Sequence, residues 1–276
     1  MRADGRQRIV AGAPATLTWQ GIDSNGEPAD PGTVTVGVVR ADGTVLVAPL
    51  TATSGSGTNP RAVALTVAQT ANLDVLTATW TVSGTVVATT QHEIVGGVYM
   101  TTAAIRAAEP SLADEAKHPT AALIAARDRS ERAWEAECRR AFVPRFKVTT
   151  VRSGVLPDYD IRAIRFVQDA DGGTIAYTHD AGSRVLTDLS TSDPVTVGYE
   201  YGWDAPPSDL LEKFARTVRH SLNAASSPLD GRVMSYTSPT GETQRFPTPG
   251  LGPWIYGIPD VDQVIIRHRV NVPGFA

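Results

Sequence analysis

The sequence predicts a multidomain α+β protein: an N-terminal all-β sandwich, a helical domain with an inserted small β region, and an extended C-terminal arm. Three observations support this fold class. β-Branched runs separated by Gly, Pro, Asn and Asp fill residues 1–97. The hydrophobic period then changes from two to about 3.6, which is typical of helices. Residues 235–258 follow neither period, although they contain several aromatic residues. The predicted domains are 1–97, 98–234 and 235–276.

Composition narrows the class of protein. The chain has 276 residues, of which 42% are hydrophobic and 20% are charged, as in ordinary globular proteins. A net charge of −4 argues against a protein whose main task is to grip nucleic-acid phosphates. A single cysteine, Cys138, excludes an internal disulfide and a cysteine-based zinc cage, and its helical setting predicts a buried core residue. No apolar run approaches a membrane span and the first residues lack a signal-peptide core, so we expect neither membrane association nor secretion.

The N-terminal domain contains at least six strand-like runs. They are ATLTWQG, TVTVGVVR, TVLV, RAVALTV, LTATWTV and VVATTQHEIV. The segment Ala41-Asp42-Gly43 is a hairpin turn signal, because Asp-Gly tolerates the positive φ of such turns. Six or seven short strands in fewer than about a hundred residues predict an immunoglobulin-like sandwich with Trp19 and Trp80 in its core. Gly96-Gly97 is interpreted as a hinge.

The helical domain is predicted from apolar spacing and from start and stop signals. A first short helix is capped by Thr101 or Thr102 and stopped by Pro110. The second is long, starts near Pro119 and ends before Pro144. The third follows a pair of prolines and has leucine, phenylalanine and valine at intervals of four. The predicted helices span about 101–109, 119–142 and 206–225.

Residues 145–202 return to strand patterns between the second and third helices. The clearest is PVTVGYEYG, in which Val195, Val197, Tyr199 and Tyr201 share one face. Turn signals occur at Asp-Gly-Gly and Asp-Ala-Gly. The run DADGG is similar to the start of a calcium loop, but glycine and glutamate are missing at the required positions, which favours a plain turn.

The arm combines prolines with bulky side chains. Disordered segments are poor in aromatic residues, so this arm is predicted to bury its side chains against something. Large apolar groups of defined shape are what protein interfaces use as hot spots. The alternative is that the arm folds back over its own domain. The candidate interface residues are Tyr236, Phe246, Trp254, Ile255 and Tyr256. Pro259 then opens a short final helix.

A basic run, CRRAFVPRFKVTTVR, joins the long helix to the first strand of the inserted region. One interpretation is a surface that faces a DNA channel or a neighbouring subunit. The other is a cation-rich helix end followed by a strand with solvated Arg and Lys side chains. The candidate residues are Arg139, Arg140, Arg145, Lys147 and Arg152.

A search for chemistry finds no catalytic arrangement. The sequence has no Gly-x-Ser-x-Gly elbow, phosphate loop or dinucleotide fingerprint. Its five histidines are scattered without metal-ligand spacing. An enzyme built on Asp158, Asp160 and His179 remains as an alternative, although no spacing supports it. We therefore expect no enzymatic activity, no cofactor and no metal.

From about Tyr99 to Arg269 the chain resembles the head–tail connector (adaptor, or head-completion) proteins of long-tailed bacteriophages. Three segments carry the resemblance, in this order and at this spacing: ERAWEAECRRAFVPR, VTVGYEYGWDAPPSDLLEKFARTVRHSL and GLGPWIYGIPDVDQVIIRHR. The first is a helix that ends in aromatic, proline and arginine residues. The second is a strand followed by prolines and a long helix. The third is a glycine-rich loop that enters a Gly-Ile-Pro-x-Val-Asp turn and a short helix.

The resemblance implies a structural virion protein assembled in the host cytoplasm. It implies a ring, of twelve copies in most such proteins, between the capsid portal and the tail. Its partners would be the portal, further copies of itself, the next neck (stopper) or tail-terminator protein, and passing double-stranded DNA that is not bound tightly. The arm would dock on the portal, and the N-terminal sandwich would decorate the ring. Truncation after Ser235 would then leave a folded chain.

A binding module of a tail or surface protein is the second hypothesis. In it, the sandwich would recognise carbohydrate or another protein. Exposed aromatic residues on the sandwich would favour this hypothesis, but Trp19 and Trp80 fall in patterns that point inward.

Overall fold

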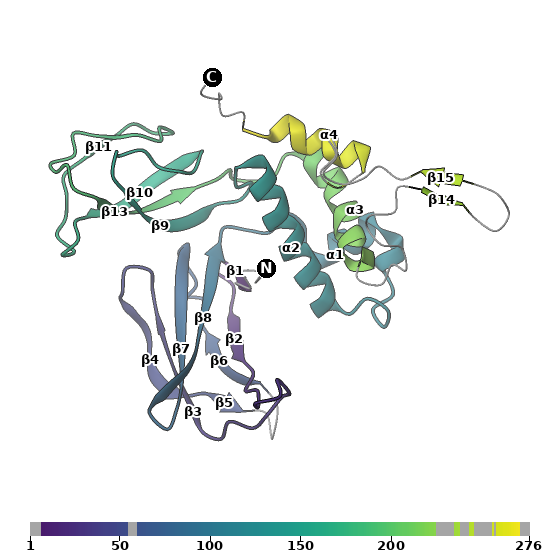
Figure 1. Cartoon of the computed structure of the whole chain (residues 1–276), viewed down its shortest axis with the longest axis horizontal. Coiled ribbons are helices and arrows are strands. Elements are labelled where there is room, and N and C mark those ends of the chain that lie inside the picture. Colours follow the sequence, from purple (N-terminus) through teal and green to yellow (C-terminus); the bar gives the residue numbers. More distant parts are fainter. Residues whose placement is uncertain are drawn as a thin grey trace. The chain divides into compact units, whose positions relative to one another are not determined.

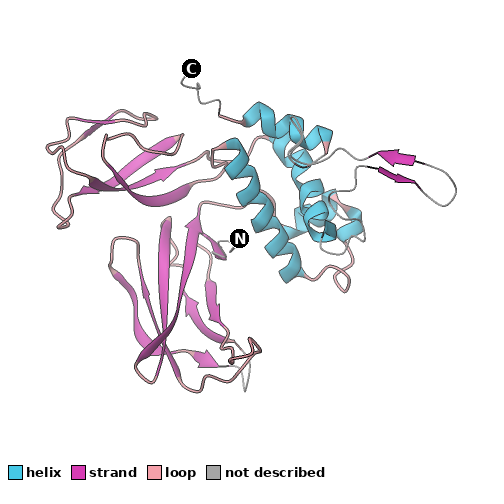
Figure 2. Cartoon of the chain, viewed as in Figure 1, coloured by secondary structure: helices cyan, strands magenta, loops and turns pink. Residues whose placement is uncertain are grey.

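The computed structural model describes residues 7–54, 60–224, 235–237, 243–245, 256 and 258–270. The chain forms two compact units, each built from two separate stretches of sequence. The β unit contains Met1–Val98 and Val143–Asp204, and the helical unit contains Tyr99–Phe142 and Ala205–Ala276. Strands build the first unit and helices dominate the second (Figure 2), which confirms the predicted α+β class.

The N-terminal part of the β unit is a sandwich of two sheets (Figure 1). The larger sheet has the strand order β1-β8-β7-β3-β4, and the smaller has β2-β6-β5. β1 is parallel to β8, whereas the other neighbours are antiparallel. The strands are β1 (Gln7–Val10), β2 (Ala15–Trp19), β3 (Val34–Val39), β4 (Val45–Thr51), β5 (Thr53–Ser54), β6 (Arg61–Leu65), β7 (Asp74–Val82) and β8 (Thr85–Val95). β1 and β5 are too short to show an alternating pattern in the sequence.

The core of the sandwich comes from alternate residues of both sheets. In β3 and β7 every second side chain is buried, as period-two patterning requires. Leu17 and Val63 from the smaller sheet meet these side chains from the opposite side. Trp80 is fully buried and stacks on the partly buried Trp19, with 6.1 Å between ring centroids. Trp80 is therefore a core anchor as predicted, and Trp19 lies at the margin of the core.

The second part of the β unit is a three-stranded antiparallel sheet of order β10-β13-β9, with a two-stranded β11-β12 ribbon. The strands are β9 (Arg145–Val151), β10 (Ile161–Gln168), β11 (Thr178–His179), β12 (Leu186–Thr187) and β13 (Val195–Tyr201). The central strand buries Val195, Val197 and Tyr199 on one face, as its alternation predicts. In sequence this region interrupts the helices, but in space it belongs to the same compact unit as the sandwich.

Gly96 lies where the sandwich meets this second region and is held in place. Its N–H donates to the carbonyl oxygen of Pro144 at 2.8 Å. A Cβ at Gly96 would lie 2.7 Å from the Pro144 ring, so only glycine permits this close approach. The position predicted as a hinge is thus a packed contact within the β unit.

The helical unit contains α1 (Thr102–Ala108), the 3-10 turn η1 (Pro110–Leu112), α2 (Thr120–Cys138), α3 (Ser208–Ala224) and α4 (Pro259–His268). The capping signals operate as predicted for α1, where Thr101 Oγ1 accepts from the N–H of Ala104 at 3.1 Å. α2 ends at Arg139, which adopts a left-handed conformation with φ 55°. α4 has Pro259 in its first turn and packs against α2 and α3.

Aromatic side chains form the centre of the helical unit. Trp134 of α2 meets Phe214 of α3 edge-on, with 5.5 Å between ring centroids. Tyr99 lies 5.1 Å from Phe214 and 5.9 Å from Phe142 by the same measure. Trp134, Phe142 and Phe214 are fully buried. Edge-on and tilted pairs of this kind add to the stability gained from burial.

α2 also buries charged residues that simple helical patterning places at the surface. Asp128 is buried and pairs with Arg127 at 2.8 Å between Nη2 and Oδ1. Glu131 is fully buried and accepts from the N–H of Tyr99 at 2.8 Å. Charged groups are buried only where such partners exist, and Tyr99 comes from outside the helix.

A short hairpin belongs to the C-terminal stretch. β14 (Ser235–Thr237) pairs antiparallel with β15 (Thr243–Arg245), and within the described part of the chain neither pairs with another strand. Elsewhere, 238–242, 246–255 and 257 are outside the described residues. In the part of the chain that the structure describes, no helix is both long and apolar enough to cross a membrane.

Candidate functional site

The predicted interface of the arm is described only at its two ends. Tyr236 lies in β14, where the backbone alone is described. Phe246, Trp254 and Ile255 lie outside the described residues. Tyr256 is described and sits three residues before α4. Only Tyr256 can therefore be compared with the prediction that these side chains are covered by a partner.

Tyr256 is held inside its own unit. Its backbone N–H donates to Asp262 Oδ1 at 2.8 Å, and its hydroxyl oxygen is buried. Burial is the main cause of the raised pKa of this phenol, with Glu137 and Cys138 of α2 adding to it. The described part of the chain covers this hydroxyl, whereas the residue as a whole is only partly buried. The expectation that Tyr256 also contacts a partner stays a prediction.

Ion pairs fasten both ends of α4 to α3. At the C-terminal end, Arg267 Nη1 and His268 Nε2 contact the carboxylate of Asp209 at 2.8 and 3.1 Å. At the N-terminal end, Arg216 Nη1 of α3 lies 2.6 Å from Asp260 Oδ2. Asp209 and Asp260 lie in the first turns of their helices and Arg267 in the last turn of α4, where the helix dipole favours these charges. Burial acts to raise the pKa of Asp209, but the hydrogen bonds from His268 and Arg267 outweigh it and lower that pKa.

A pocket of about 420 Å³ lies where α3 and the start of α4 meet. Its described lining consists of Arg216, Arg219, His220 and Ile258. Arg216 is paired with Asp260, and Arg219 Nη1 lies 2.8 Å from Glu109 Oε2. The two arginines thus serve as links within the helical unit, and Ile258 marks the point where the arm returns.

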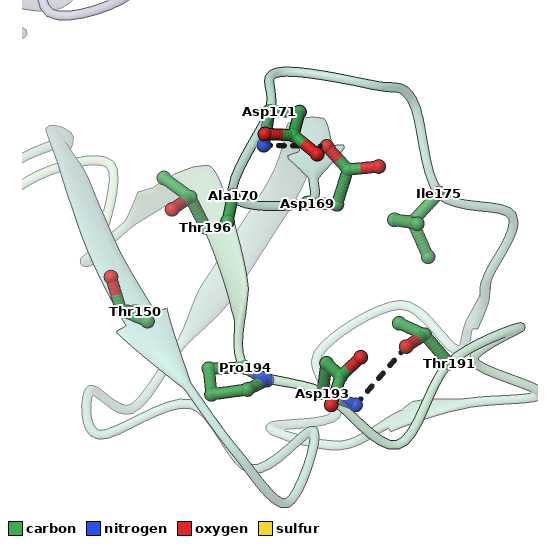
Figure 3. A pocket seen from close by; sticks show the side chains of 9 residues that line it. All are labelled: Thr150, Asp169, Ala170, Asp171, Ile175, Thr191, Asp193, Pro194 and Thr196. Carbon is green, nitrogen blue, oxygen red and sulfur yellow. Dashed lines mark hydrogen bonds between the residues drawn. The ribbon is translucent and has the colours of Figure 1, made fainter.

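The β unit has an acidic pocket of about 650 Å³ (Figure 3). Its acidic residues are Asp169, Asp171 and Asp193, and threonines supply most of the remaining polar groups. Asp169 Oδ1 accepts from the N–H groups of Asp171 and Gly173, at 3.0 and 2.7 Å. These are the contacts of a side-chain-capped hairpin turn, as predicted for DADGG. Across the described ranges, no group of three or more His, Cys, Asp or Glu side chains is placed to hold a metal ion.

The residues of the enzyme alternative have local structural partners. Asp158 accepts from Tyr199 Oη and pairs with Lys147 Nζ, the latter at 2.8 Å. His179 Nε2 contacts the Ser183 carbonyl oxygen at 2.9 Å. Burial, followed by the hydrogen bond to Asp158, raises the pKa of Tyr199. A buried tyrosine with a raised pKa keeps its proton at neutral pH, so Tyr199 acts here as a hydrogen-bond donor to Asp158.

The five residues of the basic run differ in their exposure and in their partners. Arg139 and Arg152 are exposed, Arg140 is partly buried, and Lys147 is paired with Asp158. Arg139 and Arg140 belong to the helical unit, whereas the other three belong to the β unit. Arg145 is only 2% exposed. The prediction of Arg145 as a surface cation for DNA or a neighbouring subunit is therefore wrong.

Arg145 has a structural role at the junction within the β unit. Its Nη1 lies 2.6 Å from Glu93 Oε2, which links the start of β9 to β8 of the sandwich. Arg8 Nε of β1 lies 4.0 Å from the same oxygen. Both arginine side chains are 2% exposed, and that of Glu93 is 14% exposed. Two buried cations thus share one carboxylate.

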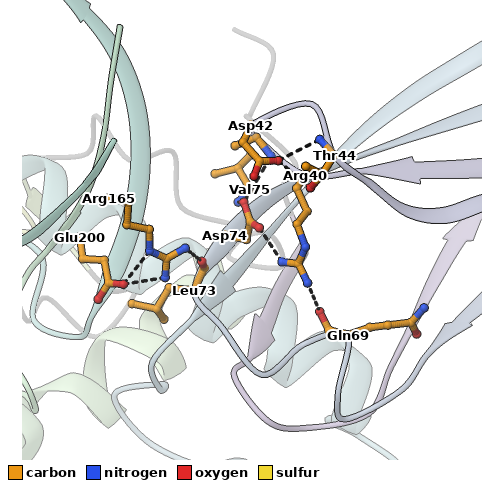
Figure 4. A network of polar contacts seen from close by, with 10 residues as sticks. Arg40, Asp42, Thr44, Gln69, Leu73, Asp74, Val75, Arg165 and Glu200 are labelled. Atoms are coloured by element: carbon orange, nitrogen blue, oxygen red, sulfur yellow. Dashed lines mark hydrogen bonds and ion pairs between the residues drawn. The ribbon is translucent and has the colours of Figure 1, made fainter. Parts of the chain in front are cut away.

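A second polar link joins the same two parts of the β unit (Figure 4). Arg165 of β10 donates through Nη1 to the carbonyl oxygen of Leu73 at 2.6 Å, and it pairs with Glu200 of β13. Asp74, which follows Leu73 in sequence, pairs through Oδ2 with Arg40 Nη1 at 2.6 Å. The segment before β7 is therefore held from both sides.

Cys138 and His92 are buried residues whose pKa values are shifted by burial. Cys138 is fully buried, as predicted, and burial raises its pKa to about 12. Such a thiol has almost no thiolate at neutral pH and is a poor nucleophile. Burial lowers the pKa of His92 to about 4. Its Nε2 lies 2.9 Å from Thr90 Oγ1, which also accepts from Trp80 Nε1 at 3.1 Å.

Asp262 was not among the predicted site residues, although it is the last residue of the Gly-Ile-Pro-x-Val-Asp turn. The structure shows a fully buried carboxylate that binds the backbone of Tyr256. The usable signal was the apolar setting, since Asp262 follows Val261 and precedes Val264 and Ile265 on the face that packs inward.

Comparisons with known proteins leave the family open. The chain matches no family model, and it matches no curated protein. It is similar to a chain in a solved structure described as the neck of an empty GTA particle computed with C6 symmetry. The identity is 15% and the TM-score 0.39, over 64% of this chain and 97% of that chain. A likeness at this level assigns neither a fold nor a function.

Proposed function

We propose that the protein is a structural component of the neck of a tailed-phage-type particle. In this proposal it forms a ring between the capsid portal and the tail and extends the DNA channel. The ring would contain about twelve copies, as the resemblance implies. The portal would lie on one side, and the next neck or tail-terminator protein on the other. The protein would have no catalytic role.

The observation that carries the proposal is the way three distant segments come together. The segments that resemble connector proteins contribute the end of α2, most of α3 and all of α4. These three helices pack against one another, although the β region separates α2 from α3 in sequence. The packing of these distant segments into one compact unit supports the proposal that they resemble connector proteins as a set.

The ion pairs support a channel through which DNA passes without tight binding. Acidic partners accompany Lys147, Arg216, Arg219 and Arg267, which are all at least partly exposed. A DNA phosphate would have to compete with a carboxylate already in place. Each phosphate contact that a protein makes strengthens binding and would retard the passing strand.

The hairpin supports an arm that needs a partner. β14 and β15 form a two-stranded sheet, which is at best marginally stable by itself in water. Each strand also has an edge that is unpaired in the described part of the chain. Edges of this kind can add to another sheet. The proposed partner is the portal.

The test uses a variant that removes the arm and keeps α4. A truncation after Ser235 is unsuitable, because it would also remove Val261 and Ile265, which are fully buried. Replacing residues 226–255 with an eight-residue Gly-Ser linker avoids this problem. Ile258 and His220 line the same pocket, and Ala224 lies about 6 Å along α3 from His220. The linker reaches roughly 26 Å, which spans this gap.

We expect the full chain to join purified portal rings, and the loop-replaced chain to remain unbound with an unchanged melting temperature. Mass photometry of each chain with and without portal measures the association. Binding by the loop-replaced chain at the wild-type level would contradict docking through the arm. Failure of the full chain to bind would contradict the neck assignment itself.

The binding-module hypothesis has less support. The large hydrophobic side chains exposed in the described residues are all aliphatic. Carbohydrate recognition commonly relies on exposed aromatic rings, and Trp80 and Trp19 are committed to the sandwich core.

A further inference from the structure

Residues 225–258 separate α3 from α4 in sequence, and both helices belong to the helical unit. Val261 and Ile265 of α4 are fully buried, and Val264 is nearly so. Beyond α4, the N–H of Val270 donates to the Cys138 carbonyl oxygen at 2.9 Å. Together with the ion pairs to Asp209 and Asp260, these contacts fix α4 along its length. The arm therefore lies in sequence between two helices that pack in the same unit.

Asp262 acts on a group outside its own helix. The N-cap residue of α4 is Ile258, and no side chain caps it. The carboxylate of Asp262 accepts from the N–H of Tyr256, two residues before the N-cap, at 2.8 Å. Asp260, in the same first turn, instead faces Lys213 and Arg216 of α3 at 3.7 and 2.6 Å. The two neighbouring acids thus have different tasks: Asp260 joins two helices, and Asp262 holds the arm.

The arrangement around Asp262 is costly for a purely structural residue. The side chain is fully buried, yet within the described residues its Oδ2 has no hydrogen-bond partner. The buried hydroxyl of Tyr256 also lacks one in the same part of the structure. Buried polar atoms without partners lower stability. Residues that break local rules at such a cost are commonly found at functional positions.

We infer that Asp262 is a positioning residue that fixes the base of the arm, so that the arm meets its partner as a loop closed at both ends. The inference about the partner rests on the proposed docking function, whereas the closed base does not. Fixing the Tyr256 backbone leaves residues 225–255 as the segment between the two attachment points. A shorter connection between fixed points lowers the entropy lost on docking.

The test compares two substitutions of similar volume at one position. Asp262→Leu removes the acceptor for the Tyr256 amide, while Asp262→Asn removes the charge and keeps an acceptor oxygen. Asp260→Asn is the matched control, because it alters the other acid of the same helical turn. The readouts are hydrogen exchange at the Tyr256 amide, exchange of the α2 segment around Trp134, and association with portal rings.

We expect Asp262→Leu to speed exchange at the Tyr256 amide by about ten- to a hundredfold, which is the range for losing a hydrogen bond to a charged group. Exchange around Trp134 should stay within about threefold of wild type. Asp262→Asn and Asp260→Asn should leave the Tyr256 amide within the same threefold limit. Portal association should weaken for Asp262→Leu and recover in Asp262→Asn.

Two results would overturn the inference. One is unchanged exchange at Tyr256 in Asp262→Leu. The other is an equal increase in Asp262→Leu and Asp262→Asn, which would attribute the effect to the lost charge. If Asp262→Leu also unfolds α2, Asp262→Asn decides: faster exchange at Tyr256 beyond the threefold limit in this variant, with no change in Asp260→Asn, would overturn the inference. If wild type ignores the portal while the exchange pattern holds, the docking function fails and the closed base stands.

Discussion

Glu93 should be one of the most sensitive charged positions in the β unit. It is the shared partner of Arg8 and Arg145, whose side chains are each only 2% exposed. The substitution Glu93→Gln keeps the size and an acceptor oxygen but removes the negative charge. The two buried arginines would then lose the negative charge that they share. Breaking a buried ion pair by removing one partner costs about 3–5 kcal/mol.

Two further variants give the expected order of effects. Arg145→Met removes one of the two cations and leaves Arg8 with Glu93, so its cost should be below that of Glu93→Gln. Glu200→Gln is the matched control, because Glu200 is also a strand glutamate paired with an arginine in the same unit. Its side chain is 24% exposed and that of Arg165 is 29% exposed. A partly solvated pair of this kind contributes about 1 kcal/mol or less.

The assay must separate the β unit from the helical unit, since the two can unfold independently. Hydrogen exchange of peptides from β7 and β8 at increasing urea concentration does this. We predict the order Glu93→Gln, then Arg145→Met, then Glu200→Gln, from most to least destabilised. A loss in Glu93→Gln no larger than that in Glu200→Gln would refute the assignment of Glu93 as the charge that holds the junction.

Three other measurements test separate parts of the account. Burial lowers the pKa of His92 from 6.5 to about 4, so the unfolded chain binds a proton more readily than the folded chain. The contribution of His92 to stability should therefore fall by about 3 kcal/mol as pH drops through this window, and it should be constant above it. The same dependence of stability on pH in wild type and in His92→Gln would count against this prediction. The thiol of Cys138 should resist alkylation at pH 8 in the folded chain and react after unfolding; fast labelling of the native protein would show that α4 does not cover it. Truncation after Ser235 should destabilise the helical unit, because Val261 and Ile265 would be lost; an unchanged melting temperature would contradict the packing of α4.

Local patterns predicted most of the fold. The alternation in β3, β7 and β13 and the apolar spacing in α3 identify elements whose buried faces lie along one stretch of chain. Pro110, Pro119 and Pro259 marked helix boundaries correctly because proline acts on its immediate neighbours. Elements of this kind depend little on the rest of the molecule.

The errors concern charged residues whose partners lie far away in sequence. Arg145 looked like a solvated strand residue, but Glu93, 52 residues earlier, makes its burial possible. The burial of Glu131 likewise depends on a distant donor, the N–H of Tyr99, 32 residues earlier. Burial of a charge depends on its partner, and no local pattern reveals a partner at such a distance.

The same limit applies to the candidate site. The sequence indicated an arm rich in aromatic residues, but it did not show where the arm ends. That boundary depends on how α4 packs against α2 and α3, and on the single contact between Asp262 and the Tyr256 backbone. Tyr256 was grouped with the predicted interface residues by its place in the sequence, and the contact of its N–H with Asp262 could not be read from that place.

The central claim is that this chain joins a portal as a ring. Its most direct test is the mass of the full-length protein in solution, alone and mixed with portal rings of the same particle. The account predicts a complex whose mass exceeds that of the portal by an integral number of copies, about twelve. A chain that stays at its own mass in the presence of portal would contradict it.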